Sequence, residues 1–422
     1  MSYKYYRQNA YVSMVVEVDG LRTPIPNGSL DAAITTNYNL AIDKQLDDSV
    51  QVLYSAIERM RKMSLGSGTR NADTILELRY PPVEADLVFT VQTGRWLYPA
   101  LGSCVTVGTA DGTDSIASGE GTATLTLTTG GRTANDLAGG YILFTSGTLD
   151  TNKYHVISNT ADPTKTVTLD KVVPAGADGA NVSFFIGPFT HNITEQENAD
   201  LMPSVAMHQE MENTTDAESI RDDALGIIVA KHTHDAEMEA EARQTVSVIM
   251  AKSVAGSDLV KPTTLAGSSN IKWGGNAATN TLTYDSGELQ SEVDKVSIEI
   301  LNNAVLRHIF GDSYALSKGF GERDYTIKIH MKPTAKDLKT LRNLAIGSMA
   351  TALAYTYKLL TSATDYIQYA FDKLYVDDFP LEIPDKANLQ YGVDITLKLC
   401  GDGACTITVV DSLGLIYYEG SS

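Results

Sequence analysis

The sequence predicts a mainly β protein, and three observations lead to that prediction. Apolar and polar residues alternate over residues 296–300 and again over residues 325–331, the period of two expected of strands buried on one face. Short strand-like runs separated by Gly, Asn and Asp turns recur between residues 105 and 187. The longest stretch with apolar residues at helical spacing is 43–63. We therefore expect mainly strands with one α-helix, plus an inserted small β-sandwich or barrel domain.

The two alternating segments are joined by a long connection with a sequence character of its own. It begins with Asn302 and Asn303, continues through an apolar patch that includes Phe310, and ends with Gly319 and Gly321. Glycine and asparagine accept backbone angles that other residues avoid. The connection is therefore predicted to be structured rather than a flexible link.

The remaining helices, strands and loops are predicted from residue periodicity and from the positions of glycine, proline and capping residues. The helix predicted over residues 43–63 ends at the Gly-Ser-Gly of residues 66–68, and Thr334 begins a capping box for a short helix over residues 334–345. Residues 380–384, rich in proline, are predicted to be a loop. Strands are predicted near residues 12–20, 74–80, 227–229, 246–250, 351–360, 365–378, 391–400 and 405–412.

Composition and charge exclude several classes of function. The chain has 422 residues, of which 43% are hydrophobic and 20% charged, as expected of a folded globular protein with two or three domains. It carries 33 Lys and Arg against 52 Asp and Glu, a net charge of -19. Binding to nucleic acid through its phosphates requires a basic surface. We therefore expect no ordinary DNA binding by this chain.

Membrane and secretion signals are not found in the sequence. No stretch approaches the about 18 apolar residues that a membrane span requires, and the N-terminus lacks the apolar core of a signal peptide. The three cysteines are too few for a disulfide framework. Cys400 and Cys405 flank the turn of residues 401–404, so they are either two reduced cysteines at strand ends, which we favour, or a pair facing each other across a hairpin.

The motifs of common enzymes are missing. The sequence has no Gly-x-Ser-x-Gly, no phosphate-binding glycine loop and no His-Glu-x-x-His. His232 and His234, followed by Asp235, would place two imidazoles on one strand face, and Asp111 and Asp114 faintly suggest a calcium turn. Each site needs further ligands that the neighbouring sequence does not supply. We predict no catalytic residue, no metal and no cofactor, and a protein that is not an enzyme.

Three segments, in this order along the chain, resemble the tail tube proteins of long-tailed viruses of bacteria and archaea. They are RWLYPALGS at residues 95–103, LMPSVAMHQEM at residues 201–211, and the central stretch with IEILNN, FGDSYA and GFGERDYTIKIHM between residues 298 and 331. The resemblance covers roughly residues 70–104 and 189–400. It implies a tail-tube-type β-sandwich with a packed α-helix.

The resemblance also implies a structural role in the virion. Copies would form hexameric rings that stack into a hollow, negatively charged tube for genome ejection, assembled in the host cytoplasm. The expected partners are other copies of the chain, the tape-measure protein, and terminator or baseplate proteins, while double-stranded DNA passes without specific binding and no membrane is involved. The alternatives are another ring-forming tail component, such as a terminator or a distal tail protein, or a secreted β-rich adhesin.

The candidate site residues follow from this implied role. Residues 237–241 form either an extended ladder of carboxylates or a solvated acidic loop or helix turn. The candidates to face the lumen are Glu237, Glu239, Glu241 and Glu299. The candidates for contacts between subunits lie in the connection and near the N-terminus: Asn302, Asn303, Phe310, Tyr314, Phe320, Tyr5 and Tyr6.

Residues 105–187 are predicted to be an insertion. Their composition shifts to Thr, Gly, Ala, Asp and Ser, and the strands on either side would belong to one sheet. The tail tube domain would then be discontinuous, residues 1–104 and 188–422. The inserted domain, Ig-like or another small β-domain, resembles modules found in virion proteins and would lie on the outer surface.

Overall fold

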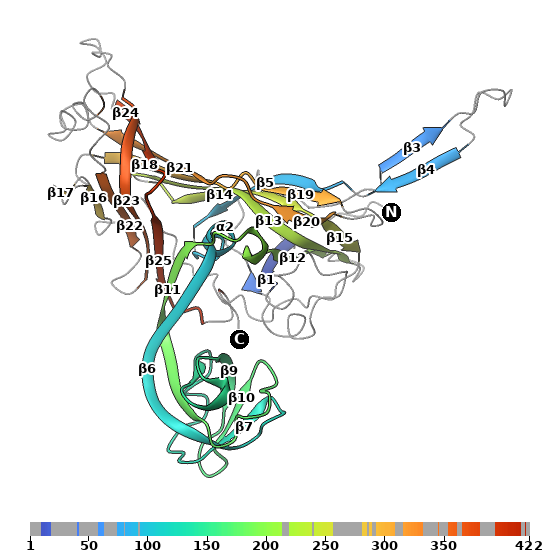
Figure 1. The fold of residues 1–422 in the computed structure, drawn as a ribbon, viewed down its shortest axis with the longest axis vertical. Helices are drawn as coiled ribbons and strands as arrows, with labels where there is room; N and C mark the ends of the chain where they lie inside the picture. Colours follow the sequence, from blue (N-terminus) through green and yellow to red (C-terminus); the bar gives the residue numbers. More distant parts are fainter. Residues whose placement is uncertain are drawn as a thin grey trace.

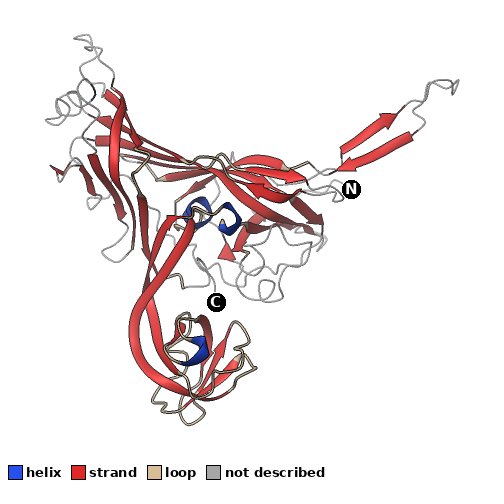
Figure 2. Cartoon of the chain, in the orientation of Figure 1, coloured by secondary structure: helices blue, strands red, loops and turns tan. Residues whose placement is uncertain are grey.

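The structure is a computed structural model, and it is mainly β. It describes residues 10–17, 40–41, 58–62, 74–79, 81–91, 93–212, 219–238, 240–255, 281–284, 287–288, 293–308, 315–331, 345, 353–360, 365–379, 393–414 and 418. Within these residues one sheet joins 21 strands, and two further strand pairs stand apart from it. In the described part of the chain, helix is confined to short segments, none of them long and apolar enough to cross a membrane (Figure 2). The mainly β class is confirmed.

The first half of the large sheet contains the two alternating segments. Its spatial order is β5 (Val83–Thr90), β14 (Arg243–Met250), β13 (Ser219–Glu237), β18 (Val293–Leu301), β21 (Asp324–Met331) and β24 (Val393–Leu399). The predicted strands are β18 and β21, which pair antiparallel with Ile298 opposite Ile327. Both isoleucines are fully buried, so the predicted inward face is confirmed.

The second half of the sheet packs against the first. It contains β22 (Leu353–Leu360), β23 (Tyr366–Asp378), β25 (Cys405–Asp411), β11 (Asn181–Glu195) and β6 (Gly102–Ser118), with β16 (Thr281–Tyr284) and β17 (Gly287–Glu288) beyond β22. Strand β23 pairs with β25 along its first part and with β24 along its second, which links the halves. Side chains from both halves, Tyr325 and Phe371 among them, share one core.

A second core lies under the N-terminal strand. Strand β1 (Ala10–Val16) pairs with β12 (Val205–Glu212) and with β2 (Leu40–Ala41), and β12 and β15 (Lys252–Ala255) both pair with β13. The carboxylate of Glu17, at the end of β1, accepts hydrogen bonds from Ser204 Oγ at 2.5 Å and Gly226 N–H at 3.1 Å. Burial raises the pKa of this carboxyl group. These contacts fix the end of β1 to β13 and to the residue that precedes β12.

A separate core forms where β6 and β11 extend away from the body of the protein (Figure 1). There they meet β7 (Thr124–Leu127), β8 (Tyr141–Phe144), β9 (Lys153–Asn159) and β10 (Thr166–Leu169), with the short helix η3 (Gly147–Leu149) between β8 and β9. All the strands expected between residues 105 and 187 are present, and the flanking segments do belong to one sheet. We call residues 111–184 the module.

The module is fixed to the strands that carry it. Tyr141 stacks on Phe185 with ring centroids 4.9 Å apart, and its hydroxyl accepts a hydrogen bond from Gly108 N–H at 3.2 Å. Lys153 Nζ donates to the carbonyl oxygen of Thr106 at 2.9 Å. Because these contacts reach back to β6, the module is oriented by more than its two connecting strands.

The helix predicted over residues 43–63 is wrong at its C-terminal end. Residues 58–62 form β3 (Glu58–Lys62), antiparallel to β4 (Thr74–Arg79), the strand predicted over residues 74–80. Arg59 lies opposite Glu77 in this pair. Pairing with β4 gives these residues a strand conformation although their apolar residues have helical spacing, because tertiary contacts commonly override local preference. Residues 43–57 lie outside the described residues, as do nearly all of the helix expected over 334–345 and the loop at 380–384.

Candidate functional site

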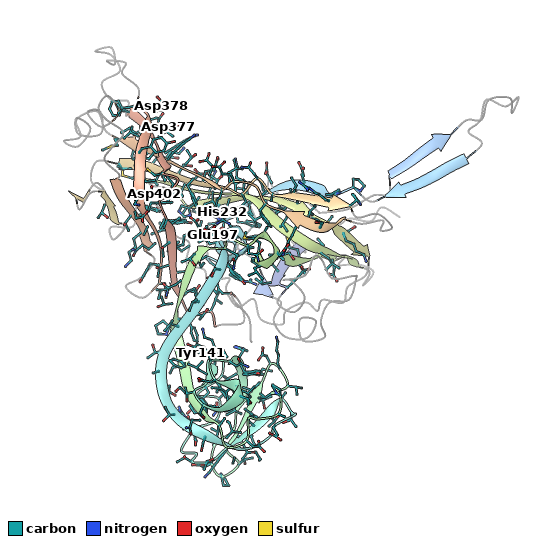
Figure 3. The ribbon with its side chains drawn as sticks, in the orientation of Figure 1. Tyr141, Glu197, His232, Asp377, Asp378 and Asp402 are labelled. Atoms are coloured by element: carbon teal, nitrogen blue, oxygen red, sulfur yellow. The ribbon has the colours of Figure 1, made fainter. Side chains whose placement is uncertain are left out.

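Polar and titratable side chains form three clusters: a junction near Glu197, a buried cluster around His232, and a network at the base of the module. Figure 3 shows Glu197 and His232 in the middle of the body, Tyr141 where the module begins, and Asp377 and Asp378 at a distant end. Each place is built from strands far apart in sequence.

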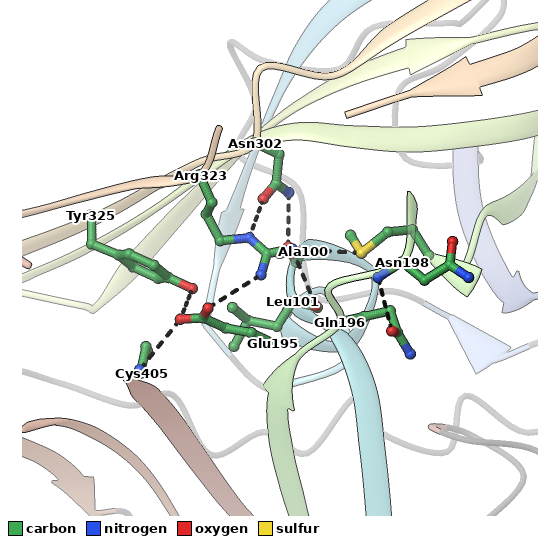
Figure 4. A network of polar contacts seen from close by, with 10 residues as sticks. Ala100, Leu101, Glu195, Gln196, Asn198, Asn302, Arg323, Tyr325 and Cys405 are labelled. Carbon is green, nitrogen blue, oxygen red and sulfur yellow. Dashed lines mark hydrogen bonds and ion pairs between the residues drawn. The ribbon is translucent and has the colours of Figure 1, made fainter. Parts of the chain in front are cut away.

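The junction is organised by Asn302, which follows β18 (Figure 4). Its Nδ2 donates to the carbonyl oxygens of Ala100 at 2.8 Å and Val229 at 3.1 Å, and its Oδ1 accepts from Arg323 Nε at 2.8 Å. Ala100 belongs to α2 (Leu97–Leu101), a five-residue helix that ends at Gly102 with φ 97°. Asn302 is 1% exposed. Its side chain therefore holds α2 in place and has no free surface for the predicted contact with another subunit.

Arg323 extends the junction to Glu195 at the end of β11. Arg323 Nη1 lies 3.8 Å from Glu195 Oε2, and Nη2 donates to the carbonyl oxygen of Leu101 at 3.3 Å. Glu195 Oε1 accepts from the hydroxyl of Tyr325 at 2.7 Å and from Cys405 N–H at 3.3 Å. Burial raises the pKa of the Tyr325 hydroxyl, which stays a donor. The network thus ties β11, β18, β21 and β25 together.

A polar pocket of about 600 Å³ opens beside this network. Carboxylates line it from two segments, Glu197 near the short helix η4 (Ala199–Leu201) and Glu322 and Asp324 near the start of β21. Arg323, which also lines the pocket, directs its guanidinium at acceptors of the chain itself. The pocket therefore offers mainly hydrogen-bond acceptors, which favour a cationic group over an anionic one.

The network at the base of the module joins a hydroxyl, an imidazole and a carboxylate. Thr106 Oγ1 lies 2.9 Å from His191 Nδ1, and His191 Nε2 lies 3.3 Å from Asp411 Oδ1. Tyr418 stacks on His191 at 3.7 Å and donates to Asp411 Oδ2 at 2.7 Å. The order resembles that of a nucleophile, a base and an acid. However, Thr106 and His191 are both 0% exposed, so no substrate reaches them, and the arrangement fastens the C-terminal segment to β6 and β11.

His232 and His234 do share one face of β13, as the sequence predicts, and that face is the core. His232 Nε2 lies 3.3 Å from Gln244 Oε1, and the His234 ring lies 5.2 Å from the ring of Tyr369 and 5.8 Å from that of Tyr357. Burial lowers the pKa of His232 to about 4 and that of His234 to about 3. Across the part of the chain that the structure describes, no three His, Cys, Asp or Glu side chains are placed to hold a metal ion.

The acidic candidates for the lumen do not form a ladder. Glu237 ends β13, Met238 and Ala240 lie in the turn that follows, and Glu241 precedes β14, so the acidic turn is the correct alternative and the extended strand is wrong. The carboxylate of Glu237 lies 3.8 Å from Lys295 Nζ. Glu299, on β18, lies 3.2 Å from Lys231 Nζ. Glu239 lies outside the described residues.

The candidates for subunit contacts fall in different environments. Asn303 is exposed, has φ 47°, and donates from Nδ2 to the carbonyl oxygen of Glu322 at 2.7 Å. Phe320 is half-buried against the cluster of Ile228 and Ile249. Between them, β19 (Val305–His308) and β20 (Ala315–Gly319) form a hairpin, so the connection is structured as predicted. Phe310, Tyr314, Tyr5 and Tyr6 lie outside the described residues.

The cysteines and the suggested calcium turn have structural surroundings. None of the three cysteines forms a disulfide, and Gly403 N–H donates to Cys400 O at 2.9 Å in the predicted turn before Cys405. Asp111 pairs with Arg132, and Asp114 accepts from the backbone N–H of Thr129 at 3.0 Å. These carboxylates are thus engaged in holding a turn of the module.

Comparison with known proteins adds no further assignment. No protein-family model matches the chain, and no curated protein matches it.

Proposed function

We propose that the chain is a non-catalytic structural subunit that assembles with copies of itself into stacked, hexameric rings, the tail tube of a long-tailed virus. The observation that carries the proposal is the pair β3 and β4, which forms a two-stranded sheet of its own and projects from the body as an arm (Figure 1). A lone two-stranded hairpin is at best marginally stable in water. A neighbouring copy is the natural support for such an arm, because association also covers exposed strand edges.

The order of sequence motifs supports the same role. In the structure the RWLYPALGS segment forms α2 and the start of β6, the second segment forms β12, and the central stretch forms β18, the β19–β20 hairpin and β21. The three segments meet at Asn302 and Arg323. In this proposal the protein belongs to the virion, contacts tape-measure and terminator or baseplate proteins, and lets DNA pass.

Charge favours a conduit that does not bind DNA. A net charge of -19 on each copy repels a polyanion, provided that unpaired carboxylates reach the lumen. Glu299 and Glu237 each lie beside a lysine, which reduces their contribution. A terminator or another ring protein of the same assembly would share these features but would stop at one ring, and a secreted adhesin would not form rings.

The module is proposed to decorate the outer surface, so assembly is expected to survive its removal. Replacing residues 108–189 with Asn-Gly would join Val107 to Thr190, which lie opposite each other in β6 and β11, through a two-residue hairpin turn. We expect the shortened chain to form the same assemblies as the full chain in electron micrographs. Loss of assembly by a folded variant would place the module in the contact between subunits.

Negative-stain electron microscopy of the purified chain over a range of concentrations tests the proposed function. We expect hollow tubes, or six-fold rings that stack as concentration rises. Single rings that never stack would favour the terminator alternative. Monomers or trimers at every concentration would favour the adhesin and contradict the tube.

A further inference from the structure

Where five adjacent strands of the second half of the sheet pair with one another, the outer face carries no carboxylate among its described residues over 105–107, 190–194, 406–408, 366–370 and 356–358. On each strand these residues alternate with buried ones, so they point away from the core. We call this surface the acid-free face. Its residues are Val105 and Val107 on β6, Thr190, Asn192 and Thr194 on β11, Thr406 and Thr408 on β25, Tyr366, Gln368 and Ala370 on β23, and Thr356 and Lys358 on β22.

The acid-free face is one continuous surface. Strand register places Val105 opposite Asn192, Asn192 opposite Thr408, and Thr408 opposite Gln368, and Gln368 lies opposite Lys358. A row of neighbouring side chains thus crosses all five strands. Val105 and its neighbour Val107 are 51% and 47% exposed, so apolar surface faces solvent at the β6 side.

Two charged residues, Lys358 and Asp372, lie on or next to this face. The ammonium of Lys358 lies 3.6 Å from the centroid of the Tyr366 ring, a cation–π contact that covers part of the aromatic surface. The first acidic residue further along β23 is Asp372, whose Oδ1 accepts a hydrogen bond from Ala404 N–H at 2.6 Å. The acid-free face therefore ends along β23 before Asp372, the first carboxylate on that strand.

The first half of the sheet has the opposite character on its outer face. There, charges of both signs alternate across β13, β18, β21 and β24, on Lys231, Asp235, Glu237, Lys295, Glu299, Asp324, Lys328, His330, Asp394 and Lys398. The chain has 52 acidic residues, and an ordinary protein surface is roughly a quarter to a third charged. The lack of carboxylates on the acid-free face is thus a property of that face and not of the composition.

We propose that the acid-free face is the surface on which a second copy of this chain docks. Two copies that each carry a charge of -19 repel each other wherever carboxylates would face carboxylates. The centres of protein interfaces are depleted of charge, as this face is. A basic partner would be drawn instead to the carboxylates elsewhere on the chain. The inference shares with the proposed function only the premise that copies associate, and it adds which surface they use.

The test places a charge on the face and measures self-association. In sedimentation velocity over a concentration series, Val105→Glu and Val107→Glu are each expected to weaken association of the full chain at least about tenfold, because like charges then face each other in the contact. The matched control is Val172→Glu, at an exposed valine of the module that is 60% exposed, which should associate as the wild type does. Circular dichroism confirms that each variant is folded.

A cross-linking measurement covers the case in which a glutamate variant does not fold. Benzoylphenylalanine in place of Val105 should, on irradiation, give a covalent pair of chains, and the same group at Val172 should give none. Association of the glutamate variants at wild-type strength, equal loss in Val172→Glu, no cross-linked pair, or a wild type that stays monomeric would each overturn the inference. Dimers formed through this face without rings would refute the proposed function alone, whereas tubes of Val105→Glu would refute the inference alone.

Discussion

Acidification below about pH 6.5 is expected to destabilise the body of the protein, because His232 and His234 are buried in the neutral form. Their pKa values in the folded chain are about 4 and about 3, against 6.5 when unfolded. Above pH 6.5 neither state is protonated, and the stability is fully present. As the pH falls from 6.5 towards 4, the unfolded chain binds protons that the folded chain does not, so stability is lost.

The size of this effect follows from the two pKa differences. One pKa unit corresponds to about 1.4 kcal/mol, so two histidines lowered by several units would remove on the order of several kcal/mol of unfolding free energy by pH 4. Urea unfolding at pH 7.5, 5.5 and 4.5 measures it as a falling midpoint. A midpoint that does not change over this range would contradict the account of the buried pair.

The variant His234→Phe separates this effect from general acid sensitivity. Phenylalanine fits among Tyr357 and Tyr369, and among the described residues His234 Nε2 and both hydroxyls have no hydrogen-bond partner that the change would remove. The pH dependence of the body should become shallower. His155 in the module, whose pKa burial also lowers to about 4, is untouched and provides the internal reference.

Removal of the Arg323 guanidinium is expected to cost roughly 2–4 kcal/mol of unfolding free energy, because buried acceptors then lose their donors. Arg323→Ala leaves Asn302 Oδ1, the Leu101 carbonyl oxygen and the Glu195 carboxylate with fewer partners. Arg323→Lys should recover little, since the one nitrogen of an ammonium cannot reach the acceptors that Nε, Nη1 and Nη2 of the planar guanidinium contact separately. Urea unfolding at neutral pH measures both variants.

The matched control for this prediction is Arg307→Ala. Arg307 is exposed on β19, so its removal should change the unfolding free energy by no more than about 0.5 kcal/mol. Equal stability of the Arg323 and Arg307 variants would show that the junction does not hold the strands together.

The sequence could predict strands in which apolar and polar residues alternate, and short strands separated by turns whose partners lie close in the chain. Ile298 and Ile327 stand in strands that the period of two identifies, and they face each other in the sheet. The strands of the module are short and punctuated by turns. By contrast, the spacing of residues 43–63 predicts a helix where residues 58–62 pair with β4, because a single chain segment does not reveal its partner.

The polar networks could not be predicted because their members come from distant segments. Glu195 and Cys405 are 210 positions apart, and Thr106 and Asp411 are still further apart, so no local motif links them. Asn302 was singled out by the sequence for contacts between subunits, whereas its amide is buried against α2. The shared face of His232 and His234 was predictable from strand period. Their burial was not, because it depends on β22 and β23.

Mass photometry of the purified 422-residue chain tests the central claim of self-assembly most directly. The account predicts a species at six times the 45.5 kDa mass of one chain, with multiples of that mass as rings stack at higher concentration. A single population at the mass of one chain, unchanged up to the highest concentration reached, would contradict it.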